Sequence, residues 1–203
     1  MAELLSLLGN NNNDLYTDII KENIEHRILV FNDEVNESVL ENYILYILKW
    51  NREDRDLPVD KRHQITIYIN SPGGSCMDGF NFVDVILQSK TPVVGVCFGL
   101  SASMGYHVAL ACHERIAFKN SILLQHDGEI AIQNSTSKAK DTMKFFDNME
   151  KRTKDYVLSR TNMTEEFYDK IYNQEYWMYA DEAKQLGCVD KIIGEDIELD
   201  EIL

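Results

Sequence analysis

The stretch VVGVCFGLSASMG (residues 93–105) decides the fold, because a buried apolar run leads there into a glycine- and serine-rich turn at the start of a helical pattern. Residues 93–98 predict a buried strand. An earlier stretch, QITIYINSPGGS (residues 64–75), has the same design, with a strand over residues 64–69 and a Pro-Gly-Gly turn after it. Strands that alternate with helices favour right-handed crossovers and a largely parallel sheet. We therefore predict an α/β fold.

The alternation continues on both sides of these stretches. A charged segment, residues 51–63, contains Pro58 and no apolar periodicity, so it is predicted to be a solvated surface loop. Further strands are expected at residues 27–32, 115–118, 122–125 and 189–193, and helices at 14–24, 39–48 after a capping Asn36, 80–87, from about 102, 137–160, 165–172 and 180–185.

The chain of 203 residues suits one sizeable core. The asparagine run at residues 10–13 is a break in composition, so residues 1–13 are expected to form a flexible N-terminal segment and residues 14–203 a single domain. The apolar stripe over residues 143–157 exceeds what one core needs. Burial against neighbouring subunits would explain it, and we expect a ring oligomer.

Charge excludes several classes of partner. The formal net charge is −14, which opposes nucleic-acid phosphates and anionic membrane surfaces. The N-terminus has no basic region or cleavage site of a signal peptide, and no apolar run reaches the length of a membrane span. The four cysteines lack disulfide or CxxC spacing and are interpreted as buried thiols. We expect a cytoplasmic protein.

The two turns after the strands are the natural place for chemistry, because loops at the carboxyl ends of parallel strands gather at one edge of the sheet. A serine at the start of a helix lies near unpaired N–H groups that stabilise an oxyanion. Residues 99–105 offer two such serines, Ser101 and Ser103, and small residues there could also serve only close packing. Gly73 and Gly74 could form a simple turn or lend an N–H to an oxyanion hole.

His126 is the histidine that best suits a general base, since it ends the predicted strand 122–125 at another carboxyl end. His26, His63, His107 and His113 have structural or solvated roles by default. Neither a P-loop nor a dinucleotide fingerprint nor metal-ligand spacing is present, so no cofactor is expected. The acidic tail, residues 195–201, and the carboxylates of residues 147 and 150 are interpreted as solvated faces.

At these residues the sequence resembles the proteolytic subunit of Clp proteases. Residues 68–75 (YINSPGGS) resemble the strand and glycine turn of that family, and residues 102–105 (ASMG) resemble its nucleophile segment. Asn120-Ser121 before His126 and the late block ADEA (residues 180–183) with GCVD (187–190) extend the resemblance over residues 14–193. It implies the ClpP/crotonase-like superhelix of βαβ units, with residues 137–160 as a protruding handle helix.

The resemblance also implies roles for individual residues. Ser103, which precedes a methionine, corresponds to the nucleophile and His126 to the general base. The backbone N–H groups of Gly74 and Met104 would form the oxyanion hole. Where the family has an aspartate before its late block, this chain has Glu175, which is the expected third member of the triad. Residues 127–129 (DGE) and the long loop 51–63 depart from the family pattern, which suggests a divergent paralogue or a phage-encoded member.

The function implied is a serine endopeptidase, the proteolytic subunit of an ATP-dependent Clp protease that hydrolyses unfolded proteins. Its partners would be an AAA+ Clp unfoldase, which uses the ATP, and further copies in heptameric rings, stacked as a tetradecamer. Three alternatives stay open: a non-catalytic ring paralogue, a phage capsid-maturation peptidase, and a crotonase-type acyl-CoA enzyme. The last would need carboxylates at the glycine turns, which are absent.

Overall fold

The computed structural model describes residues 12–203, so most of the expected flexible segment 1–13 lies outside the described residues. Helix α2 (Asn12–Glu25) begins two residues earlier than the apolar pattern predicts. Asn12 and Asn13 are therefore helical in this structure. Asparagine is well tolerated where a helix starts, so an apolar pattern alone cannot mark the first turn.

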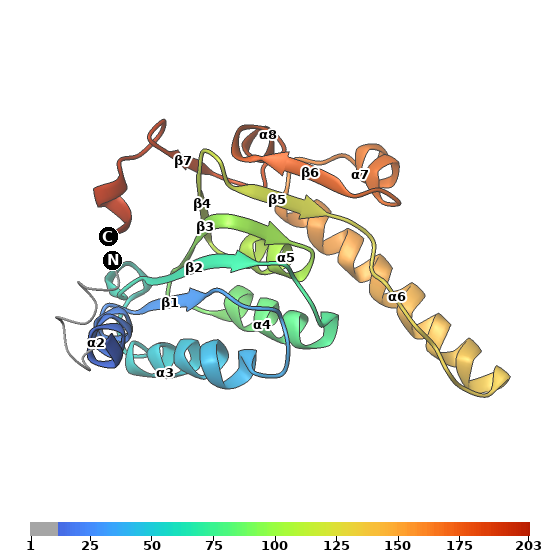
Figure 1. Ribbon diagram of the computed structural model, residues 1–203, viewed down its shortest axis with the longest axis horizontal. Helices are drawn as coiled ribbons and strands as arrows, with labels where there is room; N and C mark the ends of the chain where they lie inside the picture. The colour runs from blue at the N-terminus through green and yellow to red at the C-terminus, as the bar shows by residue number, and fades with distance from the viewer. Residues whose placement is uncertain (1–11) are drawn as a thin grey trace.

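One sheet of seven strands forms the centre of the molecule (Figure 1). Its main path has the order β1-β2-β3-β4-β7, while β5 pairs with the end of β3 and with β6. Every pair is parallel except β5 with β6. The predicted α/β class is confirmed. The strands are β1 (Ile28–Phe31), β2 (Ile65–Ser71), β3 (Val93–Ala102), β4 (Glu114–Phe118), β5 (Ile122–Gln125), β6 (Tyr176–Tyr179) and β7 (Lys191–Ile193).

Strand β3 is longer than predicted. The sequence places its end at Phe98 and a helix from Ala102, whereas the strand continues to Ala102 and the helix begins at Met104. Gly99, with φ of +65°, bends the strand without ending it, because Leu100 to Ala102 then pair with β5. The side chain of Asn70 supports this bend by accepting the N–H of Leu100 at 3.0 Å.

The helices α3, α4 and α5 connect the first strands, and Figure 1 shows α6 leaving the body as a long arm. At 25 residues α6 is about 37 Å long. It begins one residue before the predicted handle helix. The helices are α3 (Leu45–Glu53), continuous with a π-helical turn (Leu40–Ile44), α4 (Cys76–Gln88), α5 (Met104–Ala111), α6 (Thr136–Arg160), α7 (Glu165–Ile171) and α8 (Ala180–Gln185), with short 3-10 turns at Val59–Lys61 and Leu199–Ile202.

The core divides along the two faces of β3. Val93 and Cys97 face the large cluster under the helices, whereas Val94 and Val96 face a smaller cluster on the other side. Ile197 and Ile202 belong to that smaller cluster and are 8% exposed. The carboxylates of the acidic tail are exposed, as predicted, whereas Ile197 within the tail and Ile202 just after it cover apolar sheet surface.

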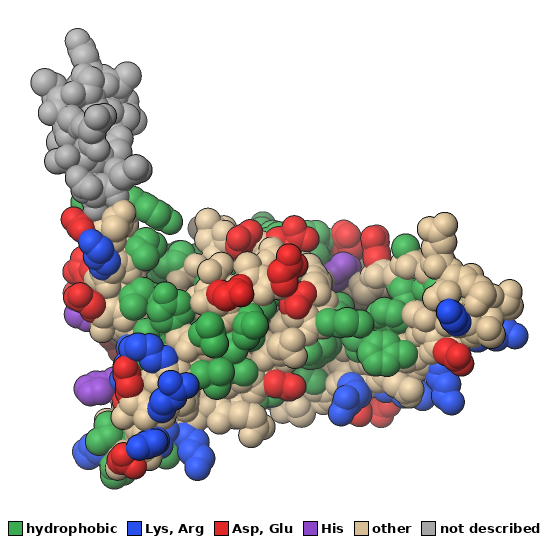
Figure 2. All heavy atoms as spheres, turned by 90° about the horizontal axis from the view of Figure 1, so that it is seen from below, with side chains coloured by type: hydrophobic (Ala, Val, Ile, Leu, Met, Phe, Trp, Pro, Cys, Tyr) green, Lys and Arg blue, Asp and Glu red, His purple; other side chains and the backbone are tan. Residues whose placement is uncertain are grey.

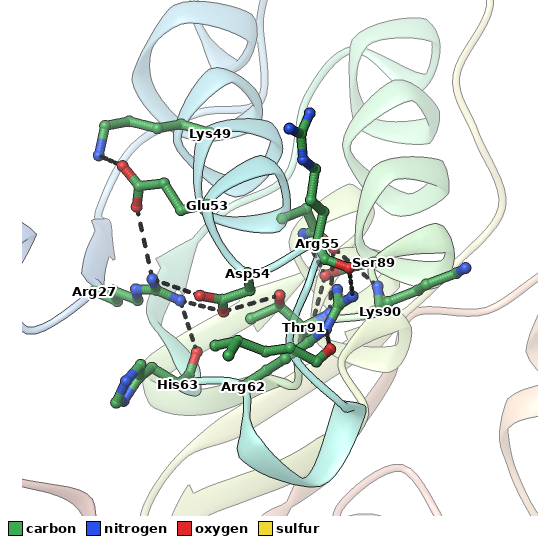
Figure 3. A network of polar contacts seen from close by, with 12 residues as sticks. Arg27, Lys49, Glu53, Asp54, Arg55, Arg62, His63, Ser89, Lys90 and Thr91 are labelled. Atoms are coloured by element: carbon green, nitrogen blue, oxygen red, sulfur yellow. Dashed lines mark hydrogen bonds and ion pairs between the residues drawn. The ribbon is translucent and has the colours of Figure 1, made fainter.

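The charged segment 51–63 also differs from the predicted solvated loop. Helix α3 runs to Glu53, and Asp54 is 2% exposed. Asp54 forms a bidentate pair with Arg27 at 2.6 and 3.0 Å and accepts the Thr91 hydroxyl at 3.3 Å (Figure 3). The pKa of Asp54 is lowered mainly by its hydrogen bond with the Arg27 guanidinium, which outweighs the rise caused by burial. This pair joins the start of β1 to the end of α3.

Candidate active site

The candidate site residues follow three neighbouring strands, at one edge of the sheet. Ser101 in β3 pairs with Ser71 in β2 on one side and with Leu123 in β5 on the other. The segments that follow these three positions therefore leave the sheet side by side. They carry the glycine turn, Ser103 and His126.

Ser103 occupies the junction between β3 and α5 in a strained conformation. Its φ is +51° and its ψ −122°, and among residues 12–203 only Arg27 is another non-glycine residue with positive φ. Such geometry costs about 1–3 kcal/mol and concentrates at functional sites. The Ser103 N–H donates to the carbonyl of Leu124 at 3.0 Å, and its own carbonyl accepts from His107 at 3.1 Å. The backbone is fixed on both sides while the hydroxyl, which caps nothing, stays half-buried.

Burial separates the two serines that the sequence offers. Ser101 lies within β3 at 0% exposure, so a substrate bond cannot reach its hydroxyl. Ser103 lies two residues further, beyond the last strand pair, and lines a cavity that His126 also lines. Of the two, only Ser103 can meet a bound peptide.

The glycine turn lies directly against the Ser103 backbone. A Cβ at Gly73, where φ is +95°, would lie 2.6 Å from the Ser103 Cβ and 2.9 Å from the Met104 nitrogen. Val35 fixes the backbone around Gly74. Its N–H donates to the Gly73 carbonyl and its carbonyl accepts from the Ser75 N–H, both at 2.8 Å. Within residues 12–203, the N–H groups of Gly74 and Met104 have no acceptor, so both are free to bind an oxyanion.

The cavity beside Ser103 measures about 80 Å³. Ser103 and His126 lie in its lining, and most of its walls come from α6 and from residues 126–130, with fewer residues from α4, α5 and α7. The apolar and aromatic part of the lining includes Phe80, Phe146, Met149, Tyr168 and Tyr172, and the polar part includes Asp127, Glu129, Glu150 and Thr153. Cys76 also lines the cavity; we expected a buried thiol, but it is half-buried, and burial raises its pKa. The arrangement fits a peptide bond at the serine and an adjoining side chain in the cavity.

Glu175 precedes β6, which the sequence did not predict as a strand. Gln125 pairs with Tyr176 in the antiparallel register, so one further step places His126 opposite Glu175. In the structure the Glu175 carboxylate is exposed and accepts the Trp177 indole N–H at 3.3 Å. Among the described residues no hydrogen bond joins the His126 ring to Ser103 or to Glu175. Catalytic hydrogen bonds often form only with substrate bound.

His107 is the site residue that sequence reasoning missed. Its place in an apolar helix favoured a structural role, yet it lines the cavity with Ser103 and His126. Burial, followed by the nearby charge of His126, lowers the pKa of His107 to about 4, so its ring is neutral near pH 7. Glu150, interpreted as part of a solvated face, is indeed exposed but also lies at the cavity.

A larger groove of about 420 Å³ lies between α4 and α6. It shares Phe80 and Met149 with the cavity and is otherwise lined by residues such as Met77 and Phe145. Neither Ser103 nor His126 contributes to it. This groove therefore lacks the reactive groups, and the smaller cavity is the candidate active site despite its size.

The chain is similar to known proteins over most of its length. A family model described as Clp protease matches residues 10–196. The chain is 28% identical over 188 residues to the ATP-dependent Clp protease proteolytic subunit 1 of Bacillus cereus, covering 92% of each. It is 30% identical over 195 residues to the proteolytic subunit 2 of Prochlorococcus marinus, covering 91% of the chain and 88% of the relative.

A solved structure of a ClpP1 mutant from Listeria monocytogenes superposes with a TM-score of 0.76. The alignment covers 91% of this chain and 99% of that one, at 24% sequence identity. At that identity the likeness establishes the fold, and it confirms the predicted ClpP-like superhelix. The roles of individual residues rest on the local geometry.

Proposed function

The chain belongs to the Clp protease family, and from that premise we propose that it is a serine endopeptidase with Ser103 as nucleophile and His126 as general base. The observation that carries this proposal is the strained backbone of Ser103, pressed against the Gly73-Gly74 turn at a cavity that His126 also lines. Strain of this kind exposes a nucleophile at a strand-to-helix turn.

The proposed reaction is acyl transfer. His126 removes the proton from the Ser103 hydroxyl, whose oxygen attacks the carbonyl carbon of the peptide bond. The N–H groups of Gly74 and Met104 donate to the oxyanion that forms. His126 then gives its proton to the leaving amine, and a water molecule, activated by the same ring, releases the acyl group from Ser103.

Glu175 is proposed to orient the His126 ring and to stabilise its cation. The register of β5 and β6 supports this role, because it places the two residues opposite each other. The carboxylate would exchange the Trp177 indole for the imidazole N–H when substrate or a neighbouring subunit arrives. A glutamate can replace aspartate in this role, as it does in triads on other folds.

Protein substrates and ring assembly follow from the family, whose matched relatives are named as proteolytic subunits of an ATP-dependent protease. We propose heptameric rings, stacked as a tetradecamer and fed by an AAA+ Clp unfoldase. The exposed apolar side chains of α3, α4 and α6 support self-association: Leu45, Met77 and Phe145 are each more than half exposed. Figure 2 shows hydrophobic side chains spread over the face that these helices form.

The chain is proposed to need no cofactor of its own, with ATP used by the partner. A cytoplasmic location is proposed on the same family grounds. No helix within residues 12–203 is long and apolar enough to cross a membrane.

Peptide hydrolysis by the Ser103→Ala variant tests the proposal. Loss of a triad member costs about 10⁴ to 10⁶ in rate, and the half-buried hydroxyl contributes little to packing, so rings should still form. Ser101→Ala is the matched control, since Ser101 lies inside β3, and it should keep most activity. Wild-type activity in Ser103→Ala would refute the assignment, and inactive wild-type rings that still bind an unfoldase would favour the non-catalytic paralogue.

A further inference from the structure

The inner wall of the cavity holds two buried polar groups without partners. His107 is 6% exposed, and within residues 12–203 neither of its ring nitrogens has a hydrogen-bond partner. The Tyr168 hydroxyl is also unpaired, and that residue is 1% exposed. Folded proteins leave few buried polar groups in this state, so each calls for a physical reason.

The surroundings of His107 are aromatic except for Gln125, whose buried side-chain oxygen is also unpaired and lies beside the ring. Aromatic rings of Phe80, Tyr106 and Tyr156 lie 5.4 to 6.2 Å from it, centroid to centroid. The Tyr156 hydroxyl donates to the His107 carbonyl at 2.7 Å, which anchors the backbone and leaves the ring free. A neutral imidazole carries one N–H donor and one acceptor nitrogen. The Gln125 oxygen can accept the ring N–H, so the acceptor nitrogen of His107 still needs a donor, and the Tyr168 hydroxyl needs an acceptor.

Both residues line the same cavity as Ser103. A cavity needs about 10–15 Å³ of this kind of volume to hold one water molecule. The cavity has about 80 Å³, which is enough for a side chain of medium length. Its other walls, such as Phe146 and Met149, are apolar and suit the methylenes of that side chain. Three carboxylates also line the cavity, the half-buried Asp127 and the exposed Glu129 and Glu150, and they disfavour an acidic side chain.

We propose that this cavity receives the substrate side chain that precedes the cleaved bond, and that His107 makes it select an uncharged hydrogen-bonding side chain, glutamine above all, over an aliphatic one. The proposal rests on the proposed function of Ser103. A glutamine amide offers a donor and an acceptor at the end of two methylenes, which matches the ring of His107 and the Tyr168 hydroxyl. An aliphatic side chain of equal length would leave both groups unpaired, and sites with buried polar groups reject such analogues.

The test compares peptides that differ only in the residue before a fluorogenic leaving group: Gln, Met, Glu or Lys. Glutamine and methionine have similar length, so their ratio of kcat/KM isolates the hydrogen bond. The wild-type ratio of Gln to Met should be about tenfold or more, since an unpaired buried group typically costs that much. His107→Phe should reverse the preference, His107→Gln should restore part of it, and Tyr168→Phe should lower it by less.

Binding separates this proposal from that of the reaction. Peptides that end in Gln or Met should bind to full-length Ser103→Ala with the same order of preference, measured by fluorescence polarisation, and His107→Phe should remove it. If no peptide is hydrolysed, the proposed function fails, but the ratio of the binding affinities for Gln and Met peptides still tests the selectivity of the cavity. Equal ratios in wild type and His107→Phe would overturn the proposal. A preference for Lys would also overturn it, because the carboxylates that line the cavity would then set the selection.

Discussion

Gly73→Ala should place a methyl group against the nucleophile. Its Cβ would lie 2.6 Å from the Ser103 Cβ and 2.7 Å from the Ala102 carbonyl oxygen, whereas carbon atoms prefer about 3.5–4.0 Å. The Ser103 turn must therefore move by about 1 Å. A displacement of that size at reacting atoms costs about 100-fold in rate. The positive φ of +95° adds about 1–3 kcal/mol of strain, and the overlap a further 1–3 kcal/mol.

Gly194→Ala is the matched control, because Gly194 has φ of +85° but nothing within 4 Å of a Cβ. It should lose stability from backbone strain alone and keep wild-type kcat/KM. Urea unfolding and peptide hydrolysis of both variants measure the two effects separately. Gly73→Ala should lose about 2–6 kcal/mol and at least 100-fold in kcat/KM. Wild-type kcat/KM in Gly73→Ala would refute the inference that this turn positions Ser103.

Three further perturbations test other parts of the structure. Glu175→Gln should lower kcat strongly with little change in KM, since the carboxylate acts on the His126 cation; unchanged kcat would place the acid elsewhere. Asp54→Asn should destabilise by up to about 3 kcal/mol, because it removes the bidentate partner of Arg27 and leaves only Glu53 at 3.6 Å and the His63 carbonyl at 3.1 Å. Folding lowers the pKa of Asp54. Its contribution to the free energy of unfolding is therefore full above the unfolded pKa near 3.9 and is lost as the pH falls through the folded pKa. Chemical unfolding between pH 7 and pH 2 should show this loss of stability in wild type and not in Asp54→Asn. Phe145→Asp on α6 should lower the mass seen by light scattering, and an unchanged ring would show that this face is not an interface.

Local patterns predicted most of the sheet but not its extensions. Apolar runs mark β1 to β5. The side chains of β2, β3 and β5 are mostly buried, whereas Val30 of β1 is 40% exposed. Strand β6 was missed because Tyr176 to Tyr179 is short and mixes exposed and buried side chains. Gly99 reads as a strand end, and only pairing with β5, more than 20 residues away, shows that the strand continues.

Tertiary pairing also explains the error over the charged segment. Nothing near Asp54 in the sequence distinguishes it from solvated neighbours such as Asp56. Its partner Arg27 lies 27 residues earlier, and the pair is buried only when β1 and α3 meet. A charge run alone cannot show which member will find a guanidinium.

The sequence brought the candidate site residues together but did not show which residues line the cavity beside them. The glycine turn, Ser103 and His126 follow three strands at one edge, so a rule for parallel sheets brings them together. The local pattern left Ser101 and Ser103 open, the family resemblance favoured Ser103, and the burial of Ser101 supports that choice. His107 was missed because a histidine in an apolar helix is indistinguishable from a core residue until the cavity is seen.

Labelling with a fluorophosphonate probe, followed by peptide mapping, tests the nucleophile most directly. The probe reacts with a serine only where a base activates it and N–H donors hold the oxyanion. Wild type and Ser101→Ala should be labelled on Ser103 alone, and Ser103→Ala should not be labelled. Label on Ser101, or a folded wild-type ring with no label at any serine, would contradict the proposed serine chemistry.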